Sequence, residues 1–318
     1  MATYTAPTKF SDTTTELGYA YVFAAERIRQ EISDRLDVLR IGLVRLEGDL
    51  VGSGSDTVRI TRYGGLGYAE AMATMGTEVA AITATGWTSG FDALTIARHG
   101  LAKEETYTNQ ILSAPDEHVG LRQMAALCPM SWLKTLRQKM CTAGAGITGV
   151  TGAATTAWSF DNELDMLRAF EETEGFDGNL VAVRHPEQLS DLRASLRNEP
   201  AYQFPESMSA LQSVRPNSEP FDFLGVRNYA TFDVTASGGG HQGFAYVPGA
   251  LGWVVASSVP VTVENPDEAM YIPEYGLVLE HSSTGSTATA RWDANAYFGV
   301  GLLDPTLFPQ RRLVSIND

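Results

Sequence analysis

Positive charge is scarce in this sequence. Its 318 residues include 23 lysines and arginines against 38 aspartates and glutamates, which gives a formal net charge of -15. A surface with this balance repels the phosphates of nucleic acids instead of releasing their counterions. We therefore expect no sequence-specific binding of nucleic acid.

Cysteine is scarcer still, because only Cys128 and Cys141 occur. They could form a nucleophile or a redox pair, but Cys128 falls on the apolar stripe of a helix-like segment, so we expect core packing. No Asn-x-Ser/Thr acceptor sequence occurs, and residues 1–15 lack the basic-then-apolar pattern of a signal peptide. We expect a mature, soluble, intracellular protein.

Long runs without charge are also rare. Residues 243–263 form such a run, with about the length of a membrane-spanning helix. Pro248, Pro260 and several glycines interrupt it, and its valine-rich pieces at 251–256 and 259–263 favour two buried strands. We expect no membrane segment.

Motifs for cofactors and catalysis are missing or out of context. Residues 144–149 match G-x-G-x-x-G, but a helix precedes them where a nucleotide-binding fold needs a strand, so we interpret them as a loop. No G-x-S-x-G pentapeptide occurs to anchor a serine nucleophile. No histidine has the His/Cys or His/Glu spacing of a zinc site; the histidines are His99, His118, His185, His241 and His281. The sequence predicts no cofactor, no metal and no catalytic residue.

Helical periodicity is present in two long segments. Ile28, Ile32, Leu36 and Leu39 predict an amphipathic helix within residues 19–45. Residues 116–140 predict a second helix, with Asp116 as the N-cap and Pro129 as a kink or interruption. Its apolar residues recur every four positions: Met124, Cys128, Trp132, Leu136 and Met140.

Two short strands enclose a long connection of small residues. Val58 and Ile60 alternate with polar neighbours and predict one strand, and Leu94 and Ile96 predict its match. Residues 64–90 between them are largely Gly, Ala and Thr. A connection this long and this poor in large side chains cannot become ordered within one subunit. We expect it to be mobile or to lie across a neighbour.

The second half of the chain reads as an α/β unit followed by strands. Residues 142–156 predict a loop or short hairpin at a domain boundary. Ser159 is positioned to cap a helix whose apolar residues are Phe160, Leu164, Leu167 and Phe170, with Gly175 as its C-terminal cap. Acidic residues at its start, Asp161, Glu163 and Asp165, suit the helix dipole better than a cation site. A strand at 179–183, a helix from Pro186, and a long strand at 287–300 with one buried face and a partner at 276–281 follow.

The order of these parts resembles the major capsid proteins of tailed bacteriophages, which have the Hong Kong 97-like fold that encapsulins share. The resemblance implies an α+β fold with four parts. These are an N-terminal arm and helix (1–50), an extended E-loop (51–100), a peripheral domain with a spine helix (101–147 and 258–318), and an axial domain (148–257).

The same resemblance implies partners and a location. The chain would self-assemble into hexamers and pentamers of an icosahedral head that encloses double-stranded DNA, in the host bacterial cytoplasm, and would remain in the virion. A separate scaffolding protein, a portal and a cement protein are implied partners. Candidate residues for contacts between subunits flank or lie in the E-loop: Arg59, Arg62, Tyr63, Trp87 and Arg98.

Two departures from the family pattern carry expectations of their own. The amphipathic helix begins almost at once, so we expect no maturation cleavage of an N-terminal scaffolding segment. No lysine occurs between Thr57 and Arg98, so we expect a shell without Lys-Asn isopeptide links. Two other functions stay open: an encapsulin-like nanocompartment shell, and a soluble hydrolase or lyase with a β-rich second domain.

Overall fold

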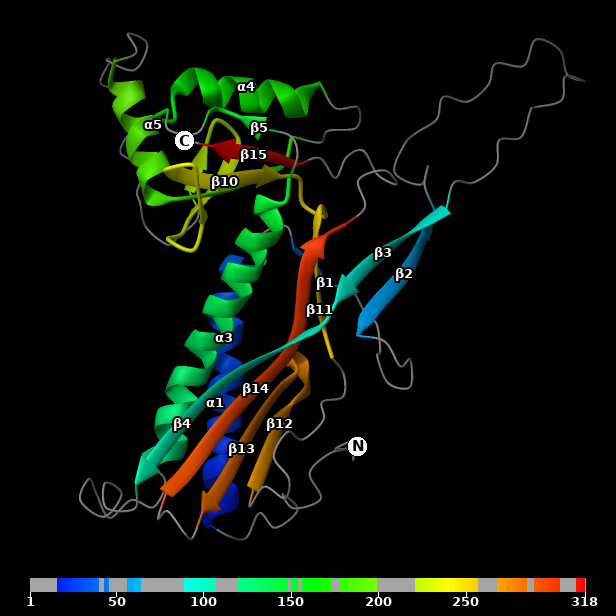
Figure 1. Cartoon of the computed structure of the whole chain (residues 1–318), viewed down its shortest axis with the longest axis vertical. Helices are drawn as coiled ribbons and strands as arrows, with labels where there is room; N and C mark the ends of the chain where they lie inside the picture. Colours follow the sequence, from blue (N-terminus) through cyan, green and yellow to red (C-terminus); the bar gives the residue numbers. More distant parts are fainter. Residues whose placement is uncertain are drawn as a thin grey trace, which may run out of the picture.

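Two sheets and a long central helix organise the molecule (Figure 1). The computed structural model describes residues 16–39, 43–45, 56–63, 89–106, 119–147, 150–153, 156–172, 178–198, 221–256, 268–284, 289–303 and 313–317. The first sheet lies along helix α3 (Val119–Ala145), and the second lies at the C-terminal end of that helix. None of the described helices combines the length and the apolar character needed to cross a lipid bilayer.

The first sheet is built around the long strand β14 (Thr289–Leu302). Its order is β1-β11-β14-β13-β12, and β4 also pairs with β14. The bounds are β1 (Leu43–Arg45), β4 (Ala97–Thr106), β11 (Leu251–Val255), β12 (Glu268–Ile272) and β13 (Leu277–Thr284). The strands are antiparallel except β1, which runs parallel to β11. The predicted strand pair at 276–281 and 287–300 is confirmed.

Strand β14 is buried on both faces, so the expectation of one buried face is wrong. Trp292, Ala294 and Phe298 belong to the apolar core, as the alternation predicts, but Asp293 and Asn295 are buried too, at 7% and 2% exposure. These polar residues tolerate burial because arginines neighbour them: Arg291 donates two hydrogen bonds to Asp293, and Arg98 donates two to Asn295.

Helices α1 (Glu16–Leu39) and α3 bring their apolar stripes into one core with this sheet. The predicted stripe of α3 is buried at every position: Met124, Cys128, Trp132, Leu136 and Met140. The predicted interruption at Pro129 is wrong, because the helix continues through it. A proline inside a helix costs about 3 kcal/mol, and burial of the stripe on both sides of Pro129 offsets that loss.

The second sheet has the order β5-β15-β10-β6-β8-β7, with β9 paired to β10. The bounds are β5 (Val150–Thr151), β6 (Leu180–Arg184), β7 (Phe221–Phe223), β8 (Val226–Ala230), β9 (Thr235–Ser237), β10 (Gly240–Tyr246) and β15 (Leu313–Asn317). Helices α4 (Phe160–Glu171) and α5 (Pro186–Asn198) lie beside it. Strand residues Ala182 and Ala245 share a core with residues of both helices, whereas Phe244 joins the core that includes α3.

For helix α4 the predicted N-cap holds, whereas the predicted C-cap and one face prediction do not. The helix ends at Glu171, and its C-cap is Glu172 in a right-handed conformation, earlier than the predicted cap at Gly175. The Ser159 hydroxyl accepts a hydrogen bond from the Asn162 backbone, so the N-cap of α4 is confirmed. Leu164, predicted on the buried face, is 44% exposed, and Glu163 is fully buried in its place. The buried face is offset by one residue because Glu163 has a charged partner inside the unit, Arg184.

The sheets divide the chain at other points than the predicted boundaries. Strand β11, predicted within the axial domain, pairs with β14, and β15, predicted within the peripheral domain, pairs with β10. Residues 142–145, predicted as loop, continue α3. Some predicted features lie outside the described residues: the connection 64–88, the caps Asp116 and Gly175, and the strand at 259–263.

Candidate assembly surface

A two-stranded ribbon projects from the first sheet (Figure 1). Strands β2 (Thr57–Tyr63) and β3 (Ser89–Thr95) pair in antiparallel register from Thr57 opposite Thr95 to Tyr63 opposite Ser89. This pairing confirms the two strands predicted around Val58 and Leu94. The ribbon forms a sheet of its own, and its chain enters β4 directly after Ile96.

The base of the ribbon packs on the body of the subunit. Val58, Leu94 and Ile96 are buried in a small cluster with residues in or directly after neighbouring strands: Val254, Ala256, Val278 and Leu303. A side chain at Gly299 would collide with the carbonyl group of Thr95, so glycine is what allows β14 to approach β3 this closely. The Ile96 amide also donates to the Asp56 carbonyl at 2.8 Å. The ribbon is therefore fixed at its base.

Beyond the base, the ribbon presents an aromatic ring and a cation to its surroundings. Phe91 is 54% exposed. The Arg59 guanidinium, also exposed, lies 5.2 Å from the centre of that ring, within range of a cation–π interaction. An exposed phenylalanine beside an arginine is the composition that protein interfaces favour.

Arg98 has a different environment from Arg59. Its Nε and Nη2 atoms donate to Asn295 Oδ1 at 3.1 and 3.0 Å, and the Asn295 amide reaches Glu280 at 3.4 Å. The guanidinium therefore serves its own subunit by satisfying a buried amide. The side chains of Arg62 and Tyr63, and the whole of Trp87, lie outside the described residues.

Other exposed apolar side chains were missed by the sequence analysis. Among the residues that the structure describes, the most exposed large apolar side chain is Phe232, at 80%, in the turn after β8. Met130 and Leu127 on α3 are 54% and 42% exposed, and Phe23 on α1 is 68% exposed. For α3 a signal was available, because Leu127 and Met130 lie off the four-residue stripe that predicts burial.

The sequence analysis also missed a polar cluster in the second unit. His185 and His241 stack with ring centres 3.4 Å apart, and both approach the carboxylate of Glu187. The expectation that no histidine has partners suited to a metal considered spacing along the chain alone. The pairing of β6 with β10 brings these residues together across 54 positions.

Known structures match this chain over most of its length, although their sequence identity to it is low. No family model and no curated protein sequence matches the chain. A protein of Mycobacterium phage Che8 superposes with a TM-score of 0.55 and 15% identity, over 86% of this chain and 89% of that one. The mature capsid of bacteriophage PhiM1 gives 0.54 and 12%, over 87% and 86%. The SrpI encapsulin of Synechococcus elongatus gives 0.51 and 9%, over 86% and 84%.

The chain has the Hong Kong 97-like capsid fold. The α+β class predicted from the sequence is thereby confirmed. Because the likeness covers most of both chains in each comparison, the capsid fold accounts for the two sheets and the long helix together. At these identities the likeness establishes the fold, and function depends on what the surfaces of this chain can do.

Proposed function

We propose that this chain is the major capsid protein of a tailed bacteriophage. In this role it self-assembles into hexamers and pentamers of an icosahedral head around double-stranded DNA. The observation that carries the proposal is the β2–β3 ribbon of a capsid fold, which directs Phe91 and Arg59 away from the core of its own subunit. A neighbouring copy supplies the surface that covers them.

The proposed parts of the subunit follow the four expected ones. Residues 1–50 form the arm and helix and residues 51–100 the E-loop. The sheet around β14 with α3 forms the peripheral domain, and the sheet around β10 forms the axial domain. Sheet pairing supports moving β1, β11 and the first residues of β4, 97–100, to the peripheral domain, and β15 to the axial domain.

Assembly of this kind depends on many weak contacts. Completing the burial of the half-exposed Phe91 ring contributes about 1 kcal/mol, and an exposed ion pair contributes about 0–1 kcal/mol. Each subunit of a closed shell meets several neighbours, so such terms add up over the lattice. Charge reversal at Arg62 should then impair assembly more than folding.

The proposed shell encloses DNA without recognising its sequence. The net charge of -15 per chain disfavours tight phosphate contacts. We propose a separate scaffolding protein, a portal and a cement protein as partners, assembly in the host bacterial cytoplasm, and a final place in the virion. The proposed role is structural and needs no cofactor and no catalytic residue.

An encapsulin-like nanocompartment shell is the second candidate, because the SrpI encapsulin shares the fold. The contents of purified particles separate the two. Packaged DNA and a portal protein support the phage head, whereas a cargo enzyme alone supports the nanocompartment. A soluble hydrolase would instead show turnover, abolished by one substitution, in a small oligomer of uniform size.

Electron microscopy tests the proposal most directly. The chain is expressed alone and together with the proteins encoded beside it, and the particles are imaged. We expect closed shells of uniform diameter in at least one of the two conditions. A compact monomer that never forms cages in either condition would overturn the proposal.

A further inference from the structure

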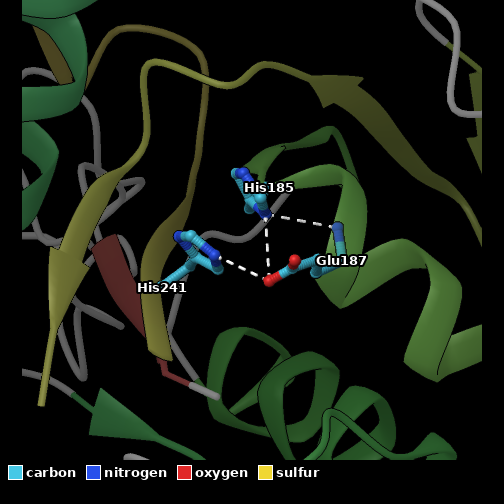
Figure 2. Close-up of side chains that lie close together, drawn as sticks. All are labelled: His185, Glu187 and His241. Atoms are coloured by element: carbon cyan, nitrogen blue, oxygen red, sulfur yellow. Dashed lines mark hydrogen bonds and ion pairs between the residues drawn. The ribbon is translucent and has the colours of Figure 1, made fainter. Parts of the chain in front are cut away.

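His185, Glu187 and His241 converge where strand β6 ends and helix α5 begins (Figure 2). His185 directly follows β6, Glu187 lies in the first turn of α5, and His241 belongs to the neighbouring strand β10. Glu187 and His241 therefore stand on regular elements, and His185 lies directly between two such elements. Sites on such elements are better preorganised than sites on loops.

The three side chains direct their donor atoms toward one another. Glu187 Oε2 lies 2.8 Å from His241 Nε2 and 3.7 Å from His185 Nδ1. The two imidazole planes are 17° from parallel, so both rings present a nitrogen to the same carboxylate oxygen (Figure 2). One ligand atom from each residue lies within 4.8 Å of the others.

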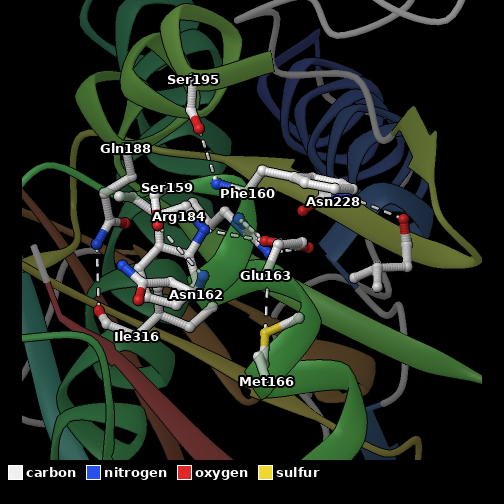
Figure 3. Close-up of polar contacts among 12 residues, drawn as sticks. Ser159, Phe160, Asn162, Glu163, Met166, Arg184, Gln188, Ser195, Asn228 and Ile316 are labelled. Atoms are coloured by element: carbon white, nitrogen blue, oxygen red, sulfur yellow. Dashed lines mark hydrogen bonds and ion pairs between the residues drawn. The ribbon is translucent and has the colours of Figure 1, made fainter. Parts of the chain in front are cut away.

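A buried glutamine fixes the spacing of the two histidines. The Gln188 side chain is fully buried. Its Oε1 accepts from the His185 amide at 2.9 Å, and its Nε2 donates to the His241 carbonyl at 2.9 Å. The same Nε2 donates to the Ile316 carbonyl at 3.1 Å (Figure 3). Gly243 leaves room for this arrangement, since a Cβ there would lie 2.8 Å from Gln188 Oε1.

These donor atoms suit a divalent cation of the zinc type. Imidazole nitrogen and carboxylate oxygen bind Zn²⁺ at about 2.0–2.2 Å, which places tetrahedral ligand atoms about 3.3 Å apart. The observed separations, from 2.8 to at most 4.8 Å, span this value. Because the two rings stack nearly parallel at 3.4 Å, one imidazole has to rotate out of the stack before both nitrogens can face the same cation. We propose that His185, Glu187 and His241 bind one such cation, with water in the fourth position.

Exposure and charge at the cluster agree with a site that a cation can reach. The side chains of His185 and His241 are 10% and 23% exposed, whereas that of Glu187 is 70% exposed. Glu187 lies in the first turn of α5, where the positive end of the helix dipole opposes a cation, so the carboxylate charge has to offset that repulsion. His185 Nδ1 now accepts from the Glu187 amide at 3.3 Å, and a cation would replace that hydrogen bond.

Metal titration of the purified full chain tests the site. The chain is stripped with a chelator and titrated with Zn²⁺ by calorimetry, and with Co²⁺ by visible absorption. We expect one equivalent per chain, a Co²⁺ spectrum with nitrogen ligation, and a rise in Tm on addition of zinc. Glu187→Gln and His241→Gln should each weaken zinc binding by at least about tenfold.

Matched controls separate this site from adventitious binding. Glu172→Gln removes an exposed carboxylate beside α4, and His281→Gln removes a histidine of β13; both should bind zinc as the unmodified chain does. Glu187 is exposed, so its variant should fold, and circular dichroism checks this. No binding at millimolar zinc, or equal binding by Glu187→Gln, would overturn the proposal.

Ring stacking without a metal is the competing explanation of the cluster. If the stripped chain binds no zinc and zinc leaves its Tm unchanged, the two rings only pack against each other and the metal proposal fails. The inference goes beyond the shell function, and the titration tests it on the unassembled chain, so its outcome does not depend on whether shells form.

Discussion

The carboxylate of Glu163 and the guanidinium of Arg184 face each other inside the second unit, and neither side chain is exposed (Figure 3). Nη1 of Arg184 lies 2.7 Å from Oε2, and Nη2 lies 2.7 Å from Oε1. The Trp158 indole donates to the same carboxylate at 2.9 Å, and its ring lies 5.5 Å from the guanidinium carbon. The Nη2 contact is a hydrogen bond and the Nη1 contact is an ion-pair approach. This buried pair links α4 to the end of β6.

Removal of one partner of this pair should destabilise the chain strongly. Glu163→Gln leaves the Arg184 charge buried without its counterion, which costs about 3–5 kcal/mol. Urea unfolding of the unassembled chain measures the loss. As a matched control, Glu172→Gln breaks the exposed pair with Arg168 and should cost about 0–1 kcal/mol. Similar costs for the two variants would contradict the importance of burial.

Replacement of both partners should reduce the free energy of unfolding less than replacement of either one alone. The double variant Glu163→Met and Arg184→Met removes both charges and leaves apolar side chains of comparable length. Buried ion pairs replaced in this way are often neutral or more stable. We expect the double variant to unfold at a higher urea concentration than Glu163→Gln. A loss equal to the sum of the single losses would show that the pair has no internal coupling.

The two thiols should resist modification in the folded chain. Burial raises the pKa of Cys128 and of Cys141 to about 12, and for Cys141 the nearby Asp233 adds to this effect. Relative to an exposed cysteine, a shift of this size lowers the thiolate fraction at pH 8 about a thousandfold. A thiol reagent with a chromogenic leaving group should therefore label the folded chain very slowly and the urea-unfolded chain at once. Rapid labelling of both thiols before unfolding would contradict the packing described for α3.

Hydrophobic periodicity predicted those helices and strands whose position depends only on the burial of apolar side chains. The α3 stripe from Met124 to Met140 follows from a four-residue spacing, and the strands around Val58 and Leu94 follow from a two-residue alternation. Both predictions are confirmed. The sequence explains Glu163 by the dipole of the helix it starts, and its burial is not foreseen because its partner Arg184 lies 21 residues away and no local pattern marks that partner. The exchange of β11 and β15 between the sheets was missed for a similar reason. The sheet to which a strand belongs depends on its pairing with distant residues, and the two-residue alternation of a strand does not identify its partner.

His99 should make stability fall on mild acidification. It lies against Phe298 beside a cavity of about 50 Å³. Burial, and then the Lys139 charge, lower the pKa of His99 from 6.5, and a backbone hydrogen bond at Phe298 partly opposes this. Below pH 6.5 the unfolded chain therefore binds more protons than the folded chain, and stability is lost as the pH falls further, through the lowered pKa.

Thermal unfolding across this pH range checks the contribution of His99. His99→Gln should flatten the fall of Tm with acidification, since it removes the titrating group. Lys139→Gln should flatten it partly, because it removes the second of the two causes. An unchanged slope in both variants would assign the pH dependence to other groups.

The exposed face of the ribbon should control assembly without controlling the fold. Phe91→Ser removes the half-exposed ring, and Arg59→Glu reverses the charge that lies over it, while the buried base at Val58 and Leu94 stays intact. We expect both variants to keep the circular dichroism of the unmodified chain and to lose most of the particles seen by sedimentation and electron microscopy. Arg59→Lys keeps the charge and should assemble nearly normally. Normal particles from Phe91→Ser and Arg59→Glu together would show that this face contacts no neighbour, and the residues that join subunits would then have to be sought elsewhere, beginning with Phe232 and Phe23.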